Sequence, residues 1–254
     1  MKIYIATDLE GVTGVYSFSQ TREQDTPANL DARRYLMLDI AAVAQGLKDC
    51  GATEIYVLDG HGRGCNFLAD HMVPGVRYIT GYPRPRPFPL LDKTFAAVIL
   101  LGYHAMNGVA DGVLHHTQSS KAEAKYWYDG VERGEIFQHA VIAGCYDLPV
   151  ILVTGDEAAC REAKATLGDA VPTVAVKKGL SREAAVLIGL EETRRMLAAG
   201  ARQAMAALPK LKPYKPALPL KMRVRRIFPE KATVENPYYV DREEVVEDPL
   251  TQMF

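Results

Sequence analysis

The sequence lacks most of the features that mark disulfide-rich, membrane-spanning or nucleic-acid-binding proteins. Its four cysteines, at positions 50, 65, 145 and 160, are widely spaced and include no C-x-x-C pair. Neither a thiolate zinc site nor a disulfide framework is therefore expected. No apolar stretch approaches the length needed to span a bilayer. A net charge of −1 over 254 residues leaves no basic excess for binding nucleic acid or an anionic membrane.

The beginning of the chain also lacks the pattern of a secretion signal. A strand-like run starts at Lys2, with no charged segment followed by a long apolar one. Because the cysteines are expected to be reduced as well, we expect a cytoplasmic protein. The hydrophobic content of 48% is that of an ordinary globular enzyme with a sizeable core, which argues against disorder.

Strands alternate with helices over roughly the first 200 residues. Apolar runs and helical spacing predict strands at 2–8, 54–58, 76–80, 96–101, 149–154 and 173–176, and helices at 31–50, 136–147, from 156 onward and at 181–207. Asp31 and Ser181 are the expected N-caps of two of these helices. The alternation predicts an α/β fold with a mostly parallel central sheet and helices on both faces.

The composition changes after Leu208, where four prolines follow within eleven residues. Residues 220–254 contain two short strand candidates and an acidic tail. We therefore divide the chain into a catalytic metal-binding α/β domain, residues 1–208, and a linker with a small C-terminal α+β subdomain, residues 209–254. Within the first domain, a hairpin is expected between strands at 124–128 and 135–137.

A segment with four prolines at alternate positions occupies residues 82–89. Alternating prolines forbid helix and ladder pairing, so the segment is expected to be extended and at the surface. A rigid connector is the favoured interpretation, and a proline-rich ligand for a partner domain is the alternative.

Several apolar runs lead into residues that could bind a metal. Asp8 and Glu10 follow the first strand, His61 follows the second, His104 follows the strand at 96–101, and Glu135 opens a further apolar run. Ligands in open α/β sheets bind at the carboxyl ends of the strands. Carboxylates and imidazoles that meet there are the donors a divalent metal needs. The pattern therefore predicts a metallohydrolase.

Each of these residues also has an ordinary structural explanation. Asp8 and Glu10 could be a helix cap and a surface acid, His104 a core residue, and Glu135 an acid that favours a helix start. The glycine-rich loop at 59–64 could bind phosphate, although its spacing matches neither G-x-G-x-x-G nor a P-loop. It is the occurrence of all these residues at strand ends that favours the metal.

Two adjacent histidines, His115 and His116, lie on a segment expected to be extended. Neighbouring side chains on such a segment point in opposite directions, so at most one faces the site. Asp59 could orient a metal-binding imidazole without itself contacting the metal. His71 and His139 have no comparable context and are interpreted as surface or core residues.

The motifs taken together resemble the zinc-dependent D-aminopeptidase family, the dipeptide-operon type of D-stereospecific metallopeptidase. The matching segments are D-x-E-G at 8–11, D-x-H at 59–61, L-G-Y-H-A at 101–105, G-V-x-x-H at 112–116, G-E at 134–135 and A-G-x-Y-D-x-P-V at 143–150, with further similarity at 175–177 and 181–182. The resemblance covers roughly residues 1–190.

The resemblance implies a metal site and a reaction. It implies two zinc ions per subunit held by Asp8, Glu10, His61, His104 and Glu135, with Asp8 bridging the ions. It implies that His116 is the catalytic histidine and that the substrates are small peptides with an N-terminal D-amino acid, of the D-Ala type. It also implies a large ring-like homo-oligomer such as a decamer. The nearly balanced charge gives no reason to expect nucleic acid or membrane partners.

Other functions could use a similar set of residues. Two close metals can activate water and polarise a carbonyl, with His116 as general acid and base. A two-metal phosphoesterase or another amidohydrolase would use the same ligands, although Arg63 is the only nearby cation that could meet a phosphate. A structural metal in a non-catalytic protein would favour a closed Cys or His set over these acids.

Overall fold

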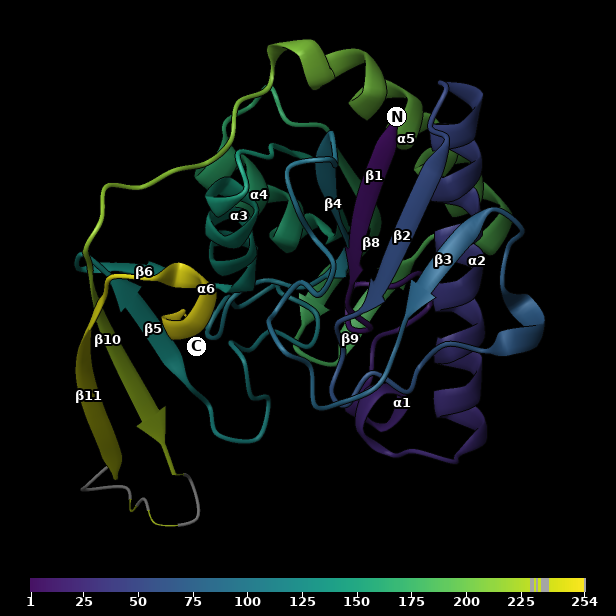
Figure 1. Cartoon of the computed structure of the whole chain (residues 1–254). Helices are drawn as coiled ribbons and strands as arrows, with labels where there is room; N and C mark the ends of the chain where they lie inside the picture. Colours follow the sequence, from purple (N-terminus) through teal and green to yellow (C-terminus); the bar gives the residue numbers. More distant parts are fainter. Residues whose placement is uncertain (229–230, 232, 234–237, 254) are drawn as a thin grey trace.

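The computed structural model describes residues 1–228, 231, 233 and 238–253, which form two sheets (Figure 1). The larger sheet has seven strands in the order β3-β2-β1-β4-β7-β8-β9. In that order the strands are Val76–Ile79, Glu54–Asp59, Lys2–Thr7, Ala97–Tyr103, Val150–Asp156, Thr173–Ser181 and Ala184–Leu187. All neighbouring strands run parallel except β8 and β9. The predicted α/β fold with a mostly parallel sheet is confirmed.

Helices cover both faces of this sheet, as predicted (Figure 1). One face is covered by α2 (Pro27–Asp49) and α5 (Leu190–Ala207), and the other by α3 (Glu135–Cys145) and α4 (Glu157–Leu167). Successive side chains of β1 enter different cores, since Ile3 and Ile5 pack with α2 and α5 whereas Tyr4 packs on the opposite face. The central strands are buried on both sides, which explains their continuous apolar sequence.

The smaller sheet is antiparallel and joins two distant parts of the chain. Its strands are β11 (Tyr239–Val246), β10 (Leu220–Ile227), β5 (Lys125–Tyr128) and β6 (Val131–Arg133) in spatial order. Two strands predicted after residue 220 are thus present, and β10 pairs with β5 from the first part of the chain. The division of the chain at residue 208 stays a prediction, and residues 229–230, 232, 234–237 and 254 lie outside the described residues.

The predicted boundaries at Ser181 and at 135–137 are wrong. Ser181 does not cap a helix, because β8 continues to Ser181 and turns into β9, so that α5 begins only at Leu190. The backbone here is held by the neighbouring loop, where the Leu114 amide donates to the Arg182 carbonyl at 2.7 Å. The second hairpin strand is β6 at 131–133, not 135–137, because the turn at Asp129-Gly130 is short and α3 starts at Glu135.

Helix α2 starts earlier than predicted, and the remaining elements are short. Thr26 caps α2, whose first residue is Pro27, so the helix begins four residues before the predicted cap at Asp31. The segment before it, predicted to be irregular, contains α1 (Phe18–Arg22) with a Ser17–Gln20 capping box. Short 3₁₀ helices occur at Ala69–His71 and Leu208–Lys210, and α6 at Pro249–Gln252. In the described part of the chain, none of the helices is long and apolar enough to cross a bilayer.

Candidate metal centre

The predicted metal-binding residues meet where the strand order of the central sheet reverses. The chain passes from β1 to β2 and β3 on one side, and continues with β4, β7 and β8 on the other. Ligand sites in open α/β sheets form at such a switch point, beyond the carboxyl ends of the strands. Asp8 follows β1, His61 follows β2 and His104 follows β4. The topology alone therefore brings these three residues to one place.

Two glycines allow the loops after β1 and β4 to touch. The Gly11 amide donates to the Gly102 carbonyl at 2.8 Å. A Cβ at Gly11 would lie 1.9 Å from the Tyr103 carbonyl oxygen, and one at Gly102 would lie 2.5 Å from the Asp8 carbonyl oxygen. Any larger residue at either position would separate the loops. The glycines thus fix Asp8 next to His104.

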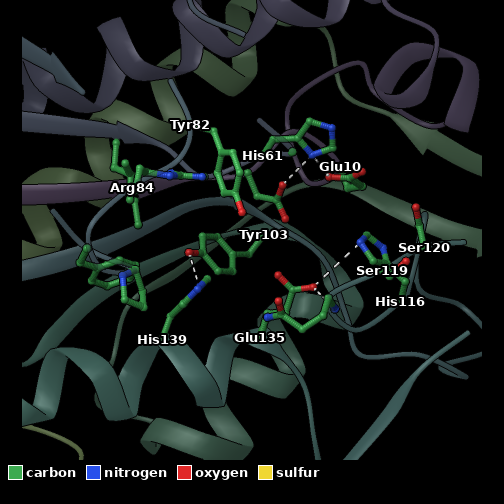
Figure 2. A pocket seen from close by; sticks show the side chains of 18 of the residues that line it. Glu10, His61, Tyr82, Arg84, Tyr103, His116, Ser119, Ser120, Glu135 and His139 are labelled. Atoms are coloured by element: carbon green, nitrogen blue, oxygen red, sulfur yellow. Dashed lines mark hydrogen bonds and ion pairs between the residues drawn. The ribbon is translucent and has the colours of Figure 1, made fainter. Parts of the chain in front are cut away.

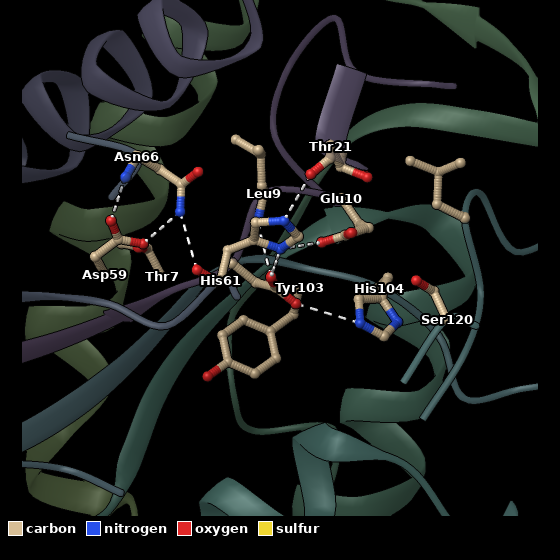
Figure 3. Close-up of polar contacts among 12 residues, drawn as sticks. Thr7, Leu9, Glu10, Thr21, Asp59, His61, Asn66, Tyr103, His104 and Ser120 are labelled. Atoms are coloured by element: carbon tan, nitrogen blue, oxygen red, sulfur yellow. Dashed lines mark hydrogen bonds and ion pairs between the residues drawn. The ribbon is translucent and has the colours of Figure 1, made fainter. Parts of the chain in front are cut away.

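His61 faces two carboxylates with one ring nitrogen and a carbonyl with the other (Figure 3). Its Nε2 lies 3.0 Å from the Thr21 carbonyl oxygen, which can only accept, so Nε2 carries the hydrogen. Its Nδ1 lies 3.0 Å from Asp8 Oδ1 and 3.0 Å from Glu10 Oε2. In a neutral imidazole, Nδ1 would then point a lone pair at two acids, which is unfavourable without a cation between them.

His104 repeats the arrangement on the other side of Asp8. Its Nδ1 donates to the Ala105 carbonyl at 2.9 Å. Its Nε2 lies 3.2 Å from Asp8 Oδ2 and 3.5 Å from Glu135 Oε1. The two oxygens of Asp8 therefore serve two imidazole–carboxylate clusters, one with His61 and Glu10, the other with His104 and Glu135.

Charge in this cluster strongly shifts the ionisation of its members. Burial alone would raise the pKa of Asp8, but the close polar contacts and charges of His104 and His61 outweigh it and hold the pKa well below its usual value. Burial alone would lower the pKa of His61, but the charges and hydrogen bonds of Glu10 and Asp8 raise it well above its usual range. The acids therefore attract positive charge to this position.

Among the described residues, two buried atoms of the cluster, Glu10 Oε2 and His104 Nε2, have close polar neighbours but make no hydrogen bond of acceptable geometry. Unsatisfied buried polar atoms are costly and need a physical explanation. Both are metal-donor atoms, and the groups Asp8–Glu10–His104 and His104–His116–Glu135 each bring their donor atoms within 4.8 Å of one another. A set of carboxylate oxygens and imidazole nitrogens fits divalent zinc.

The structure separates the two adjacent histidines. His116 is 7% exposed, lines the pocket, and its ring stacks on His104 with centroids 3.9 Å apart. Its Nδ1 donates to the Leu114 carbonyl at 2.8 Å, which leaves Nε2 on the side of Glu135, 3.9 Å from Oε1. His115 points elsewhere and accepts from the Gly108 amide through Nδ1 at 3.0 Å. Burial and the nearby His104 lower the pKa of His116, which favours the neutral ring.

A buried lysine holds the loop that carries Glu10. Lys177 on β8 is 1% exposed, and its Nζ donates to the carbonyls of Glu10, Val12 and Val15 at 2.6, 2.8 and 2.5 Å. Burial lowers its pKa to about 8, so that the ammonium is still charged at neutral pH. This single side chain fixes three successive points of the loop after β1.

Asp59 supports the site in a way the sequence did not predict. Its carboxylate accepts from the backbone and side-chain amides of Asn66, at 2.6 and 2.9 Å, and Asn66 Nδ2 also donates to the His61 carbonyl at 3.0 Å (Figure 3). The ring of His61 is held by other groups. Asp59 thus fixes the backbone of His61 and does not orient an imidazole.

The chain is similar to known D-aminopeptidases over most of its length. The family model described as D-aminopeptidase matches residues 1–241. The chain belongs to the D-aminopeptidase family. The D-aminopeptidase of Bacillus subtilis (strain 168) is 31% identical over 221 residues, which cover 85% of this chain and 78% of that protein. The resemblance in the motifs is therefore confirmed.

A solved structure has the same fold. It is the Zn-dependent D-aminopeptidase DppA from Bacillus subtilis, described as a self-compartmentalizing protease. The TM-score is 0.88 at 24% identity, and the match covers 100% of this chain and 94% of the other. At this identity the likeness establishes the shared architecture of the D-aminopeptidase fold, including both sheets.

In this member of the D-aminopeptidase family, several residues around the candidate metal centre were not predicted from the sequence to be part of it. The cavity of about 810 Å³ beside the candidate metal ligands is also lined by Tyr103, His139 and the proline-rich segment (Figure 2). Tyr103 Oη lies 2.6 Å from His139 Nδ1. His139 follows Glu135 by four residues on α3, and that helical spacing could have revealed it. The proline-rich segment is more than a connector, because it supplies Tyr82 and Arg84 to the wall.

Proposed function

We propose that this protein is a zinc-dependent aminopeptidase that removes the N-terminal residue of short peptides, of the D-Ala type, with two zinc ions per chain. The observation that carries the proposal is the repeated geometry around Asp8. Two histidines each use one nitrogen for a backbone carbonyl and direct the other at two carboxylates, 3.0–3.5 Å away. Family membership supports the peptidase activity, and the name of the structural relative supports zinc.

The two clusters suggest which residues would hold each ion. Asp8 Oδ1, Glu10 and His61 Nδ1 would hold one ion, and Asp8 Oδ2, His104 Nε2 and Glu135 the other. Each imidazole is fixed by a carbonyl on its far side, a common support for metal-binding histidines. Asp8 would be the bridging ligand.

When bound, the zinc ions would polarise the scissile carbonyl and lower the pKa of an attacking water. His116 is the residue of this chain placed to move the proton. Its Nδ1 hydrogen is committed to Leu114, so the Nε2 lone pair faces the cluster and can accept a proton. The same nitrogen would then return that proton to the leaving amine, which makes His116 a general base and general acid.

Assembly, location and partners belong to the same proposal. The structural relative is described as self-compartmentalizing, so we propose that this chain also forms a homo-oligomer, with a decameric ring as the specific expectation. A cytoplasmic location and the lack of nucleic acid and membrane partners also remain predictions.

Metal analysis with paired substrates tests the proposal. The purified protein should contain about two zinc per chain by mass spectrometry and should cleave the p-nitroanilide of D-Ala faster than that of L-Ala. Two metals with hydrolysis of p-nitrophenyl phosphate and no amidase activity would move the function to phosphoesters. Absence of metal after zinc reconstitution would overturn the assignment of the ligands.

A further inference from the structure

The cavity beside the metal cluster has an acidic floor and a basic rim. Asp8, Glu10 and Glu135 lie on the floor, and four cationic residues also line the cavity: Arg22, Arg84, Arg86 and Lys121. Elsewhere in the described chain many lysines and arginines form ion pairs, but none of these four has a carboxylate oxygen within 4.0 Å among the described residues. The rim cations are therefore not engaged in direct ion pairs with described residues, and carboxylates act on them at longer range, as Asp59 does on Arg84 and Glu10 on Arg22.

Arg84 is distinguished from the other three by burial and position. Arg84 is partly buried, while Arg22, Arg86 and Lys121 are exposed. One amino group of Arg84 donates to the Asp59 carbonyl at 2.6 Å, which anchors the guanidinium to the end of β2. No hydrogen bond of its Nε or second amino group occurs within the described residues. A guanidinium has five N–H donors, so most of its capacity is available.

The other rim cations are less suited to meet a ligand. Arg22 donates twice to Ser120 and lies over the Phe18 ring, 3.3 Å from its centroid. Arg86 donates to the Tyr146 hydroxyl at 3.2 Å. An exposed cation is strongly screened by water and salt, whereas a partly buried one is screened less. Arg84 is therefore the strongest anion-binding group on the rim.

The surroundings of Arg84 leave room for an anion. Its neighbours in the cavity wall are Tyr82, Tyr103 and His139 (Figure 2). Burial lowers the pKa of His139 to about 4, so this ring is neutral at neutral pH. Figure 2 shows Arg84 and His116 on opposite sides of the cavity, with His61 and Glu135 between them. A ligand processed at the cluster would thus extend in one of two directions, toward Arg84 or toward Ser119 and Ser120.

We propose that Arg84 binds the C-terminal carboxylate of the substrate, and that the cavity therefore selects short peptides with a free C-terminus. This inference rests on the proposed aminopeptidase function. The planar fork of a guanidinium matches a carboxylate with two parallel hydrogen bonds, which a lysine cannot do. A cavity of about 810 Å³ is within the usual size of small-ligand sites, which suits a peptide of a few residues.

The test compares two substrates that differ only in this group, D-Ala-D-Ala and D-alanyl-D-alaninamide. The zinc-loaded wild type should have a kcat/KM for the free acid at least about tenfold above that for the amide, since a hydrogen bond to a charged group is worth about that much. In Arg84→Gln this ratio should fall to about one, a loss of at least about tenfold. Arg84→Lys keeps the charge but loses the fork, and should retain an intermediate ratio.

A matched control removes the same charge from the same segment. Arg86→Gln should keep the acid-to-amide ratio within about twofold of the wild type. The Arg86 side chain is exposed to solvent and already donates a hydrogen bond to the Tyr146 hydroxyl. An equal loss in both variants would overturn the proposal, since the general charge of the rim would then set the preference. Zinc content and thermal midpoint of each variant exclude misfolding as the cause of a changed ratio.

The failure of this inference differs from that of the proposed function. A wild type that cleaves the acid and the amide equally well would overturn the role of Arg84 and leave the aminopeptidase intact. A wild type that cleaves neither, but hydrolyses p-nitrophenyl phosphate with a dependence on Arg84, would assign the guanidinium to phosphate and overturn both.

Discussion

The two sheets contribute to the metal centre in different ways. The central sheet provides Asp8, Glu10, His61 and His104 directly at the ends of buried parallel strands. The small sheet leads into Glu135, which lies two residues beyond the end of β6 and is the first residue of α3, and its outer strand β11 is exposed over seven of its eight residues. The parallel sheet thus positions most of the candidate metal ligands, and the hairpin of the antiparallel sheet leads into the remaining one, Glu135.

The small sheet reaches the metal centre through a chain of hydrogen bonds. Tyr128 on β5 accepts from Gln138 Nε2 at 2.9 Å, and Gln138 Oε1 accepts from Gln118 Nε2 at 2.8 Å. The backbone amide of Gln118 then donates to Glu135 Oε1 at 2.6 Å. The comparison therefore gives a ranking: substitutions at the strand ends should affect the metals and the chemistry, and substitutions in the small sheet mainly the stability.

The largest effect is expected at Asp8, which both clusters share. Asp8→Ala removes an oxygen from each cluster and leaves His61 and His104 facing one acid each. Zinc content should fall from about two per chain to one or fewer, with loss of measurable amide hydrolysis. Mass spectrometry of the metal-loaded protein measures the zinc content, and a D-Ala-p-nitroanilide assay measures amide hydrolysis. Asp70→Ala, at an exposed acid outside the site, is the control. Retention of two zinc in Asp8→Ala would show that Asp8 does not bridge.

His116 should separate chemistry from metal binding. His116→Ala should lower kcat by about 10²- to 10⁴-fold, the usual contribution of a general acid–base group, while zinc content stays at the wild-type value. His115→Ala is the matched control, because the neighbouring ring points away from the cavity. If His115→Ala lost as much activity as His116→Ala, the assignment of the proton-transferring histidine would be wrong.

Lys177 tests whether the loop after β1 needs its internal support. Lys177→Met removes the ammonium donor from three carbonyls, of which Val12 keeps the Val15 amide, and each unpaired carbonyl costs about 1–3 kcal/mol. The free energy of unfolding should fall by about 3 kcal/mol or more, and zinc should bind more weakly because Glu10 is less well positioned. Denaturant unfolding and zinc titration measure the two effects. Lys178→Met, at the exposed neighbour, should change neither. If the Lys177→Met variant were as stable as the wild type, water would have to supply the hydrogen bonds that the ammonium donates to these carbonyls.

The sequence predicted the central sheet well because its signals are local. Continuous apolar runs mark strands buried on both faces, and the acids and histidines that follow them are visible in the same stretch of sequence. Arg84 and Lys177 have no such local signal. Their roles depend on contacts with residues 25 and 162–167 positions away along the chain. The turn at 181–184 was missed for the same reason, since Arg182 is held by Leu114 from a distant loop.

The smallest effect is expected in the small sheet, at Tyr128. Its hydroxyl donates to the Met253 carbonyl at 2.7 Å and accepts from Gln138, and both groups are buried. Tyr128→Phe should lower the free energy of unfolding by about 1–3 kcal/mol, because it leaves buried polar groups unpaired. Zinc content and kcat should stay near the wild-type values, whereas Tyr239→Phe on the exposed strand β11 should change nothing. Loss of zinc in Tyr128→Phe would contradict the ranking of the two sheets. It would mean that the hydrogen-bond chain through Gln138 and Gln118 holds Glu135 in place, and that the antiparallel sheet is part of the metal centre.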